Sequence, residues 1–169
     1  LGDYAKARDV LERALAIKER TYGRDHPNVA IILTNLGNAY GDLGDNAKSR
    51  DMLERALAID ERTYGRDHPN VAITLTNLAN ALRALGDPSK AVELLGRALA
   101  IKERAYGKDH VKTVFTLRDI GKAYCDLGDT AKARDFLQRA IPLFERANNN
   151  AGAKFCRKKL KSLSGRGHE

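Results

Sequence analysis

An Asp-His pair is the arrangement in this chain that most suggests chemistry, and it occurs three times. The pair stands at residues 25–26, 67–68 and 109–110. The first two copies lie in the dodecamer RTYGRDHPNVAI, which the sequence spells twice without a change, at 20–31 and 62–73. A carboxylate beside an imidazole can serve as a general acid or base, or can hold a metal ion. The duplication supports a second interpretation, in which the same joint is built more than once.

The spacing of the histidines favours the structural interpretation. His26, His68 and His110 follow one another at intervals of 42 residues. If each begins an equivalent helix, neighbouring helices stand ~8–10 Å apart, whereas zinc needs ligands ~2 Å from one ion. Pro27 and Pro69 follow the first two histidines and favour a helix start. We predict an N-cap role, with no metal, no cofactor and no catalytic residue; metal binding or acid-base use is the alternative.

The elements that position these residues belong to a tandem array. The tripeptide Leu-Gly-Asp begins at Leu1, Leu43, Leu85 and Leu127, each 42 residues after the last. Residues 3–44 and 45–86 differ at nine of 42 aligned positions, so 33 are identical. A fixed period of this length is typical of helical repeat proteins.

Two apolar stripes in each period predict two helices. Val29, Leu33, Leu36 and Tyr40 follow the spacing of one helix face, and a second stripe covers 47–59. Between the stripes, a Gly-Asp pair suits a helix end followed by an N-cap, so the two helices should be antiparallel. The helices of the first kind are predicted at 28–42, 70–84 and 112–126, and those of the second kind at 3–21, 45–63, 87–105 and 129–147.

The repeated dodecamer is predicted to form the other joint. Gly23 and Gly65 can end a helix with a positive φ, which is accessible to glycine. The tyrosines before these glycines, Tyr22 and Tyr64, are expected to pack across the joint, as is Tyr106 in the third period.

The pattern Leu33-x2-Leu36-Gly37-x2-Tyr40, followed by Ser49-x3-Leu53-x2-Ala56, resembles the tetratricopeptide repeat (TPR). The usual period of that family is 34 residues. The longer period here, with its extra ERTYGRDHP segment, is similar to the variant found in kinesin light chains. The resemblance implies an all-α fold, a right-handed α-solenoid of antiparallel helix pairs whose first helices line a concave groove.

The array is predicted to cover residues 1–147, as a half repeat followed by three periods. A C-terminal capping helix is expected within 148–164, around 151–163, followed by a tail at 165–169. Its apolar side would carry Phe155, Cys156, Leu160 and Leu163. The net charge of +8 is concentrated here, because residues 154–169 contribute +5.

Polar residues of the first-kind helices form the candidate groove. An asparagine pair recurs there, and an amide can both donate to and accept from a peptide backbone. Basic residues toward the C-terminal part would favour an acidic ligand. The alternative is a solvated polar face copied by duplication. The predicted ligand-binding residues are Thr34, Asn35, Asn38, Thr76, Asn77, Asn80, Arg83, Arg118 and Lys122.

Three classes of function are open to such a chain. A scaffold that binds an extended peptide or partner protein is favoured, because nearly the whole length is repeat. Homotypic assembly through the uncovered N-terminal helix is an alternative, and nucleic-acid binding through the basic C-terminal helix ranks below it. An enzyme is not predicted, because no glycine-rich phosphate loop or nucleophile with an identifiable base is present. No membrane partner is expected, and two cysteines favour a reducing, cytoplasmic compartment.

Overall fold

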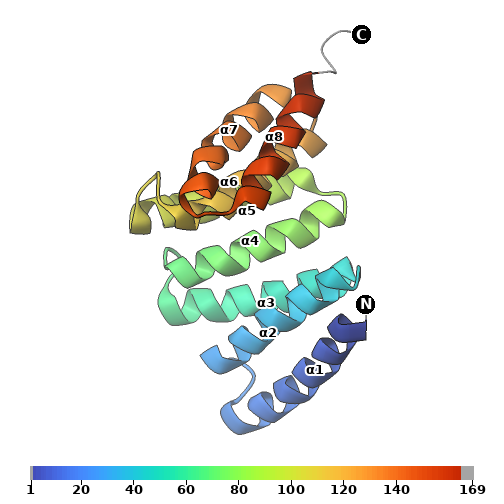
Figure 1. Ribbon diagram of the computed structural model, residues 1–169. Coiled ribbons are helices and arrows are strands. Elements are labelled where there is room, and N and C mark those ends of the chain that lie inside the picture. The colour runs from blue at the N-terminus through green and yellow to red at the C-terminus, as the bar shows by residue number, and fades with distance from the viewer. Residues whose placement is uncertain (1, 165–169) are drawn as a thin grey trace. The chain divides into compact units, whose positions relative to one another are not determined.

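The computed structural model describes residues 2–164 and is all-α (Figure 1). The predicted helices are confirmed to within one residue at each end, apart from the start of the third first-kind helix, which begins with a 3-10 turn. The predicted tail at 165–169 lies outside the described residues. The elements are α1 (Gly2–Tyr22), α2 (Pro27–Asp42), α3 (Asn46–Tyr64), α4 (Pro69–Ala84), α5 (Pro88–Tyr106), the short 3-10 helix η1 (Val111–Thr113), α6 (Val114–Asp126), α7 (Thr130–Arg146) and α8 (Asn150–Ser164).

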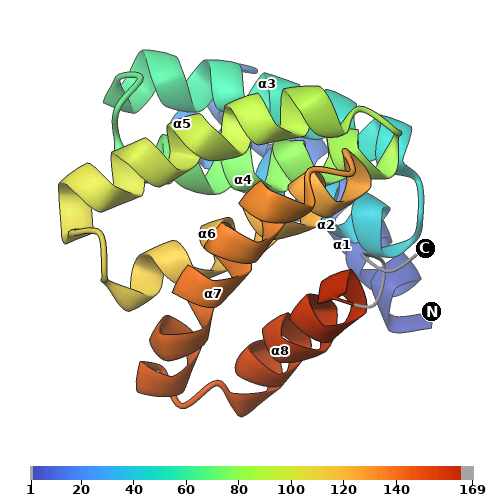
Figure 2. The ribbon, with the colours of Figure 1, turned by 90° about the horizontal axis from the view of Figure 1, so that it is seen from above.

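The chain divides into two compact units, Leu1–Asp87 and Pro88–Glu169. In the first unit, α1 packs on α2, α2 on α3 and α3 on α4, and α2 also touches α4. In the second unit, α5 packs on α6, α6 on α7 and α7 on α8. Within each unit, successive helices run antiparallel, as α7 and α8 show in Figure 2. Each unit therefore contains one of the helix pairs that the two stripes predict, α2 with α3 in the first unit and α6 with α7 in the second.

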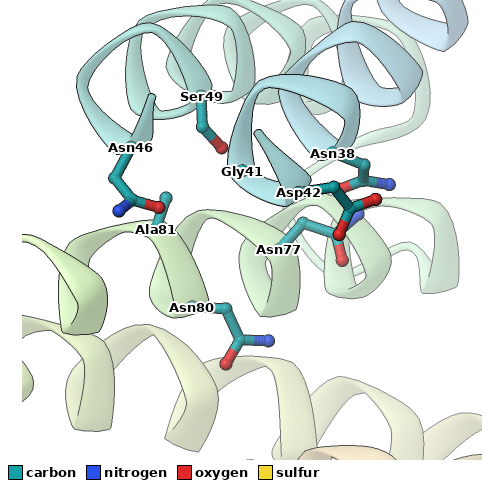
Figure 3. Close-up of a pocket in the computed structure, with 8 residues that line it drawn as sticks. All are labelled: Asn38, Gly41, Asp42, Asn46, Ser49, Asn77, Asn80 and Ala81. Atoms are coloured by element: carbon teal, nitrogen blue, oxygen red, sulfur yellow. The ribbon is translucent and has the colours of Figure 1, made fainter. Parts of the chain in front are cut away.

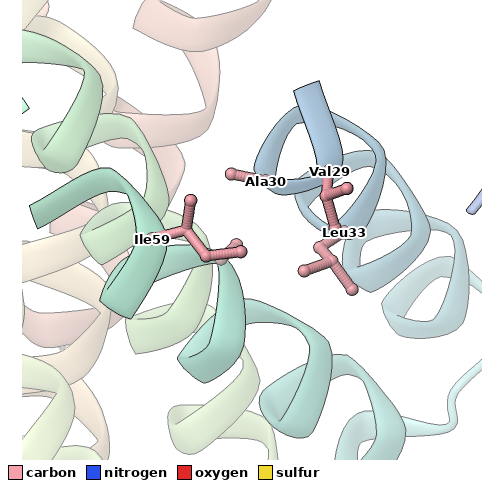
Figure 4. Close-up of a cluster of buried hydrophobic side chains, with 5 residues drawn as sticks. Val29, Ala30, Leu33 and Ile59 are labelled. Atoms are coloured by element: carbon pink, nitrogen blue, oxygen red, sulfur yellow. The ribbon is translucent and has the colours of Figure 1, made fainter. Parts of the chain in front are cut away.

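The core of the first unit is formed by the predicted apolar stripes. Val29 and Leu33 of α2 are fully buried, and they meet Ala56 and Ile59 of α3 (Figure 4). Full burial of a Val, Leu or Ile side chain contributes about 1.5–3 kcal/mol each. The pairing of α2 with α3 thus rests on apolar contact between the two helices.

The tight turns between paired helices have the predicted glycine and aspartate. Gly44 has a φ of 85°, and Asp45 accepts a hydrogen bond from the backbone N–H of Lys48 at 3.2 Å. In the second unit, Asp129 accepts the equivalent bond from Lys132 at 3.0 Å. These caps satisfy amide groups that the first helical turn leaves without a carbonyl partner.

The last helix, α8, packs closely on α7. A Cβ atom added at Gly152 would lie 2.5 Å from the ring of Phe144, so the two helices approach where only glycine fits. Cys156 and Leu163, which were predicted for the apolar side of this helix, are buried. Phe155, which the sequence places beside them, is instead 41% exposed. None of the described helices combines the length and the apolar character needed to cross a bilayer.

Candidate functional site

The three histidines of the Asp-His pairs are helix caps. Nδ1 of His26 accepts a hydrogen bond from the backbone N–H of Asn28 at 3.1 Å. His68 and His110 accept the same bond from residues 70 and 112, also at 3.1 Å. The Nδ1 atom therefore acts as an acceptor in every copy, and the predicted N-cap role is confirmed.

The neighbours of the histidines also serve the joint. Tyr22 stacks on His26 with ring centroids 4.7 Å apart, and Tyr64 stacks on His68 at 4.8 Å. Asp25 is paired with Arg62 of α3, at 3.2 Å from Oδ2 to Nη1. Among residues 2–164, no group of three or more His, Cys, Asp or Glu side chains is arranged to hold a metal ion.

In each unit, an equivalent ion pair links two successive helices of the second kind, α1 with α3 and α5 with α7. In the first, Arg55 Nη2 lies 2.5 Å from Glu19 Oε1. In the second, Arg139 Nη2 lies 2.7 Å from Glu103 Oε1. The residues of the two pairs are 84 positions apart, or two periods, so the dodecamer region is a joint that the chain builds repeatedly.

The predicted asparagines of α2 and α4 line a pocket in the first unit. Its volume is about 430 Å³, and Asn38, Asn77 and Asn80 contribute to its wall. Figure 3 shows these side chains with those of Asp42, Asn46 and Ser49, which come from the end of α2 and the start of α3. The pocket wall is thus rich in amides and carries one carboxylate.

A second pocket, about 260 Å³ in volume, lies on the same two helices near their N-terminal ends. The predicted residues Thr34 and Asn35 line it. Ile31 and Ile73 supply apolar wall, and Asp60 of α3 reaches it as well. The further lining residues are Ala30, Tyr64, Asn70 and Thr74.

Three of the predicted amides have no hydrogen-bond partner within the described part of the chain. Within residues 2–164, the side chains of Asn35, Asn38 and Asn77 form no hydrogen bond, and each is at least partly exposed. Asn80 and Arg83 are half-buried and have interactions of their own within the chain.

Thr76 faces differently from its predicted neighbours. Its side chain is only 8% exposed, and Oγ1 donates a hydrogen bond of 2.7 Å to the carbonyl of Ala72, one turn earlier. Such a bond is common for threonine within a helix. The hydroxyl is therefore bonded to the α4 backbone.

Arg118 and Lys122, predicted for the same groove, lie on α6 in the second unit. Both pair with one carboxylate: Asp119 Oδ1 lies 2.9 Å from Arg118 Nη2 and 3.5 Å from Lys122 Nζ. The Asp119 side chain is 2% exposed, whereas the two cations are about a quarter exposed. The three groups together carry a formal charge of +1.

Asp60 is a buried carboxylate that the sequence analysis does not single out. It is 7% exposed, and its Oδ2 accepts a hydrogen bond of 2.7 Å from Thr74 Oγ1. Burial raises the pKa of this carboxyl, while the Thr74 hydrogen bond and His68 act in the opposite direction. The signal that could have found it is a difference between the near-identical periods, because Lys18 holds this place in the first.

A scan against protein families matches the tetratricopeptide repeat at residues 1–62, 32–104 and 90–146. Since these matches span most of the sequence, the chain belongs to the tetratricopeptide repeat family. Proteins of this family are typically non-catalytic and serve as protein-protein interaction modules. No curated protein matched the sequence.

Solved structures show the same fold at low sequence identity. Nearly identical TPR-like repeats of a putative kinesin light chain from Podosopora anserina match with a TM-score of 0.75 at 20% identity, over 99% of this chain and 90% of theirs. A second structure of those repeats, which carries a substitution, matches with a TM-score of 0.75 at 21% identity. The match covers 98% of this chain and 88% of that one. BtubC (BKLC) from P. vanneervenii matches with a TM-score of 0.73 at 19% identity, over 99% of this chain and 76% of that one. The structural neighbours are thus kinesin-light-chain-like TPR proteins.

Proposed function

We propose that the α2 and α4 face of the first unit binds an extended segment of a partner protein. The observation that carries this proposal is the set of three amides, Asn35, Asn38 and Asn77, which make no hydrogen bond within residues 2–164. Two of them line the 430 Å³ pocket and the third lines the 260 Å³ pocket. An amide can accept from a backbone N–H and donate to a backbone carbonyl.

The repeat geometry supports an extended ligand. Packed helices stand ~8–10 Å apart, which matches about three residues of extended chain at ~3.3 Å each. Asn35 and Asn77 occupy the same place in successive periods. A ligand crossing from α2 to α4 would therefore meet the second amide about three residues after the first.

The second unit provides the acidic part of the proposal. Arg118 and Lys122 keep exposed surface beside the buried Asp119, and their site carries a formal charge of +1. A carboxylate of a ligand would be attracted there, and salt would weaken that attraction. This element of the proposal is independent of the amides in the first unit.

Nucleic-acid binding is the less favoured alternative. Neither of the two pockets described on α2 and α4 has a lysine or arginine in its wall. The exposed basic residues of α8 are the observation in its favour, and one of them, Arg157, is paired with Glu145. A phosphate-binding surface would give affinity that falls steeply with salt.

Self-association has one observation in its favour, on α1. Ile17 is 57% exposed, whereas Ile59, at the same place in the next period, is 2% exposed. Light scattering over a concentration series, on the chain and on an Ile17→Lys variant, tests this second candidate. A mass that rises with concentration for the chain and stays monomeric for the variant would support it.

Selection of peptides on the immobilised protein tests the main proposal. A random 12-residue library is enriched on the unaltered chain, and recovered peptides are titrated against an Asn35→Ala, Asn77→Ala variant. We expect the double variant to bind about one to two decades more weakly, because each lost hydrogen bond costs roughly 0.5–1.5 kcal/mol. The control is Gln138→Ala, which removes an exposed amide from α7. Equal binding by all three proteins would reject the proposal.

A further inference from the structure

The smaller pocket of the first unit contains the buried carboxylate of Asp60. Asp60 is 7% exposed, and Thr74 donates one hydrogen bond of 2.7 Å to its Oδ2. Among the described residues, no lysine or arginine forms an ion pair with Asp60. Burying a charge without a counter-ion is costly. The side chain nevertheless lines a pocket that opens on the α2 and α4 face.

Comparison of the first two periods shows that the carboxylate and its hydrogen-bond donor are both absent from the first. Residues 3–44 and 45–86 differ at nine positions, and two of these are Lys18 against Asp60 and Ile32 against Thr74. In the third period the same two places are Lys102 and Thr116, whose side chains are hydrogen-bonded at 2.7 Å. Asp60 is thus the only acidic residue at this place in the three periods, so this carboxylate is particular to the second period.

The walls around the carboxylate are mostly apolar. Ile31 and Ile73 are 56% and 52% exposed, and Tyr64 is 39% exposed. All three line the pocket. A volume of about 260 Å³ is below the ~300–1,000 Å³ of ordinary small-molecule sites. The space therefore suits one side chain that has an aliphatic stem and a polar end.

We propose that this pocket receives one lysine or arginine side chain of the partner segment, whose cation pairs with Asp60 and whose stem lies between Ile31 and Ile73. The inference deepens the proposed function and rests on it. Lysine and arginine bury their methylene groups along apolar surface while the charged end finds a polar partner. A cation from the ligand would supply the counter-ion that the described chain does not.

The neighbouring polar groups fit the same ligand. Asn35 lines the pocket and could hold the ligand backbone beside the inserted side chain. Thr74 donates to Oδ2, so Oδ1 is left for the cation. Burial raises the pKa of the Asp60 carboxyl, and an arriving cation would reverse that effect by favouring the charged form.

The test uses the full chain and two probes. The first probe is the random 12-residue peptide library. The second is N-acetyl-lysine methylamide, which carries the proposed side chain without a longer peptide, with N-acetyl-norleucine methylamide as its uncharged match. Binding of the small probes is followed by NMR on the side-chain amide of Asn35. The variants are Asp60→Asn, which keeps the shape, and Glu54→Gln, which removes an exposed charge from the same helix.

We expect the unaltered chain and Glu54→Gln to select peptides with lysine or arginine at one position. Replacing that residue by norleucine should weaken binding about tenfold or more, because a hydrogen bond to a charged group is worth about 1.5–3 kcal/mol. The Asp60→Asn variant should show no preference for peptides with lysine or arginine, and it should bind the basic peptide and its norleucine derivative equally well. N-acetyl-lysine methylamide should shift the Asn35 amide more than its norleucine match does, and only while Asp60 is present.

The two proposals fail differently. Peptides that depend on Asn35 and Asn77, but show no basic preference or keep it in Asp60→Asn, would overturn the basic pocket and leave the groove standing. No recovered peptide, together with an acetyl-lysine signal that requires Asp60, would overturn the groove alone. If no peptide is recovered and N-acetyl-lysine methylamide gives no signal that depends on Asp60, both the groove and the basic pocket would be overturned.

Discussion

Nδ1 of His68 accepts a hydrogen bond of 3.1 Å from the backbone N–H of Asn70, and the imidazole thereby caps α4. The adjacent Tyr64 ring stacks on the same imidazole. The histidine that looked most like a catalytic or metal-binding group is therefore committed to starting a helix. Its two counterparts, His26 and His110, make the same bond.

Replacing His68 by alanine should destabilise the chain by about 1 kcal/mol, the usual cost of losing an N-cap side chain. His68→Asn should recover most of the loss, since asparagine is a good N-cap residue. Urea unfolding with equal slopes for all variants measures the difference. A purified chain that held stoichiometric zinc, and lost it in His68→Ala, would show that the histidine is a ligand instead.

Replacing Gly65 by valine should cost on the order of 1 kcal/mol or more, because Gly65 has a φ of 85° and a β-branched residue strongly disfavours positive φ. Space is not the reason, since a Cβ there would meet no atom within 4 Å. The matched control is Gly96→Ala on α5. Its Cβ would also meet nothing, but its backbone is helical, so a stabilisation of roughly 0.5–1 kcal/mol is expected. Equal effects of the two substitutions in thermal unfolding would contradict this explanation.

Asp60→Asn should raise the free energy of unfolding at neutral pH. Burial raises the folded-state pKa of Asp60 above its ordinary value of 3.8, so the folded chain holds this proton more tightly than the unfolded chain does. Stability contributed by the protonated carboxyl is then present below pH 3.8 and is lost as the pH rises through the folded-state pKa. The advantage of the asparagine variant should accordingly be largest at neutral pH and should fade toward pH ~3. Denaturant unfolding of both proteins across this range measures it, and a variant less stable at neutral pH would contradict a buried charge that opposes folding.

The helices could be predicted closely because local signals agreed with one another. Apolar stripes such as Val29, Leu33 and Leu36 set the buried faces, while glycines with positive φ and capping residues such as Asp45 set the ends. The third period shows the sensitivity of these signals. Its Val111 stands where proline stands in the others, and the helix there starts with a 3-10 turn.

The candidate site was less predictable. Helix periodicity shows on which face of a helix a side chain lies, but it does not show which residues that side chain contacts. Asn35, Asn38 and Asn77 lie on the pocket walls, but Thr76, from the same predicted set, turns its hydroxyl to the Ala72 carbonyl. The pairing of Arg118 and Lys122 with a buried Asp119 needs three-dimensional distances. The role of Asp60 cannot be predicted from the sequence, because a single acidic residue on a charged helix is usually solvent-exposed, whereas Asp60 is buried.

The proposed function requires the amides of α2 and α4 to hold an extended peptide. NMR titration of the chain with a peptide recovered from the 12-residue library measures this directly, by following the backbone amide signals together with the side-chain NH2 signals of all asparagines. We expect saturable shifts of the Asn35, Asn38 and Asn77 side-chain signals, and a loss of affinity of about one to two decades in the Asn38→Ala, Asn77→Ala variant. The free energy of unfolding of that variant should differ from that of the unaltered chain by no more than ~0.5 kcal/mol. Saturable shifts confined to α8, around Arg157 and Lys158, with the three asparagine signals unmoved, would contradict it.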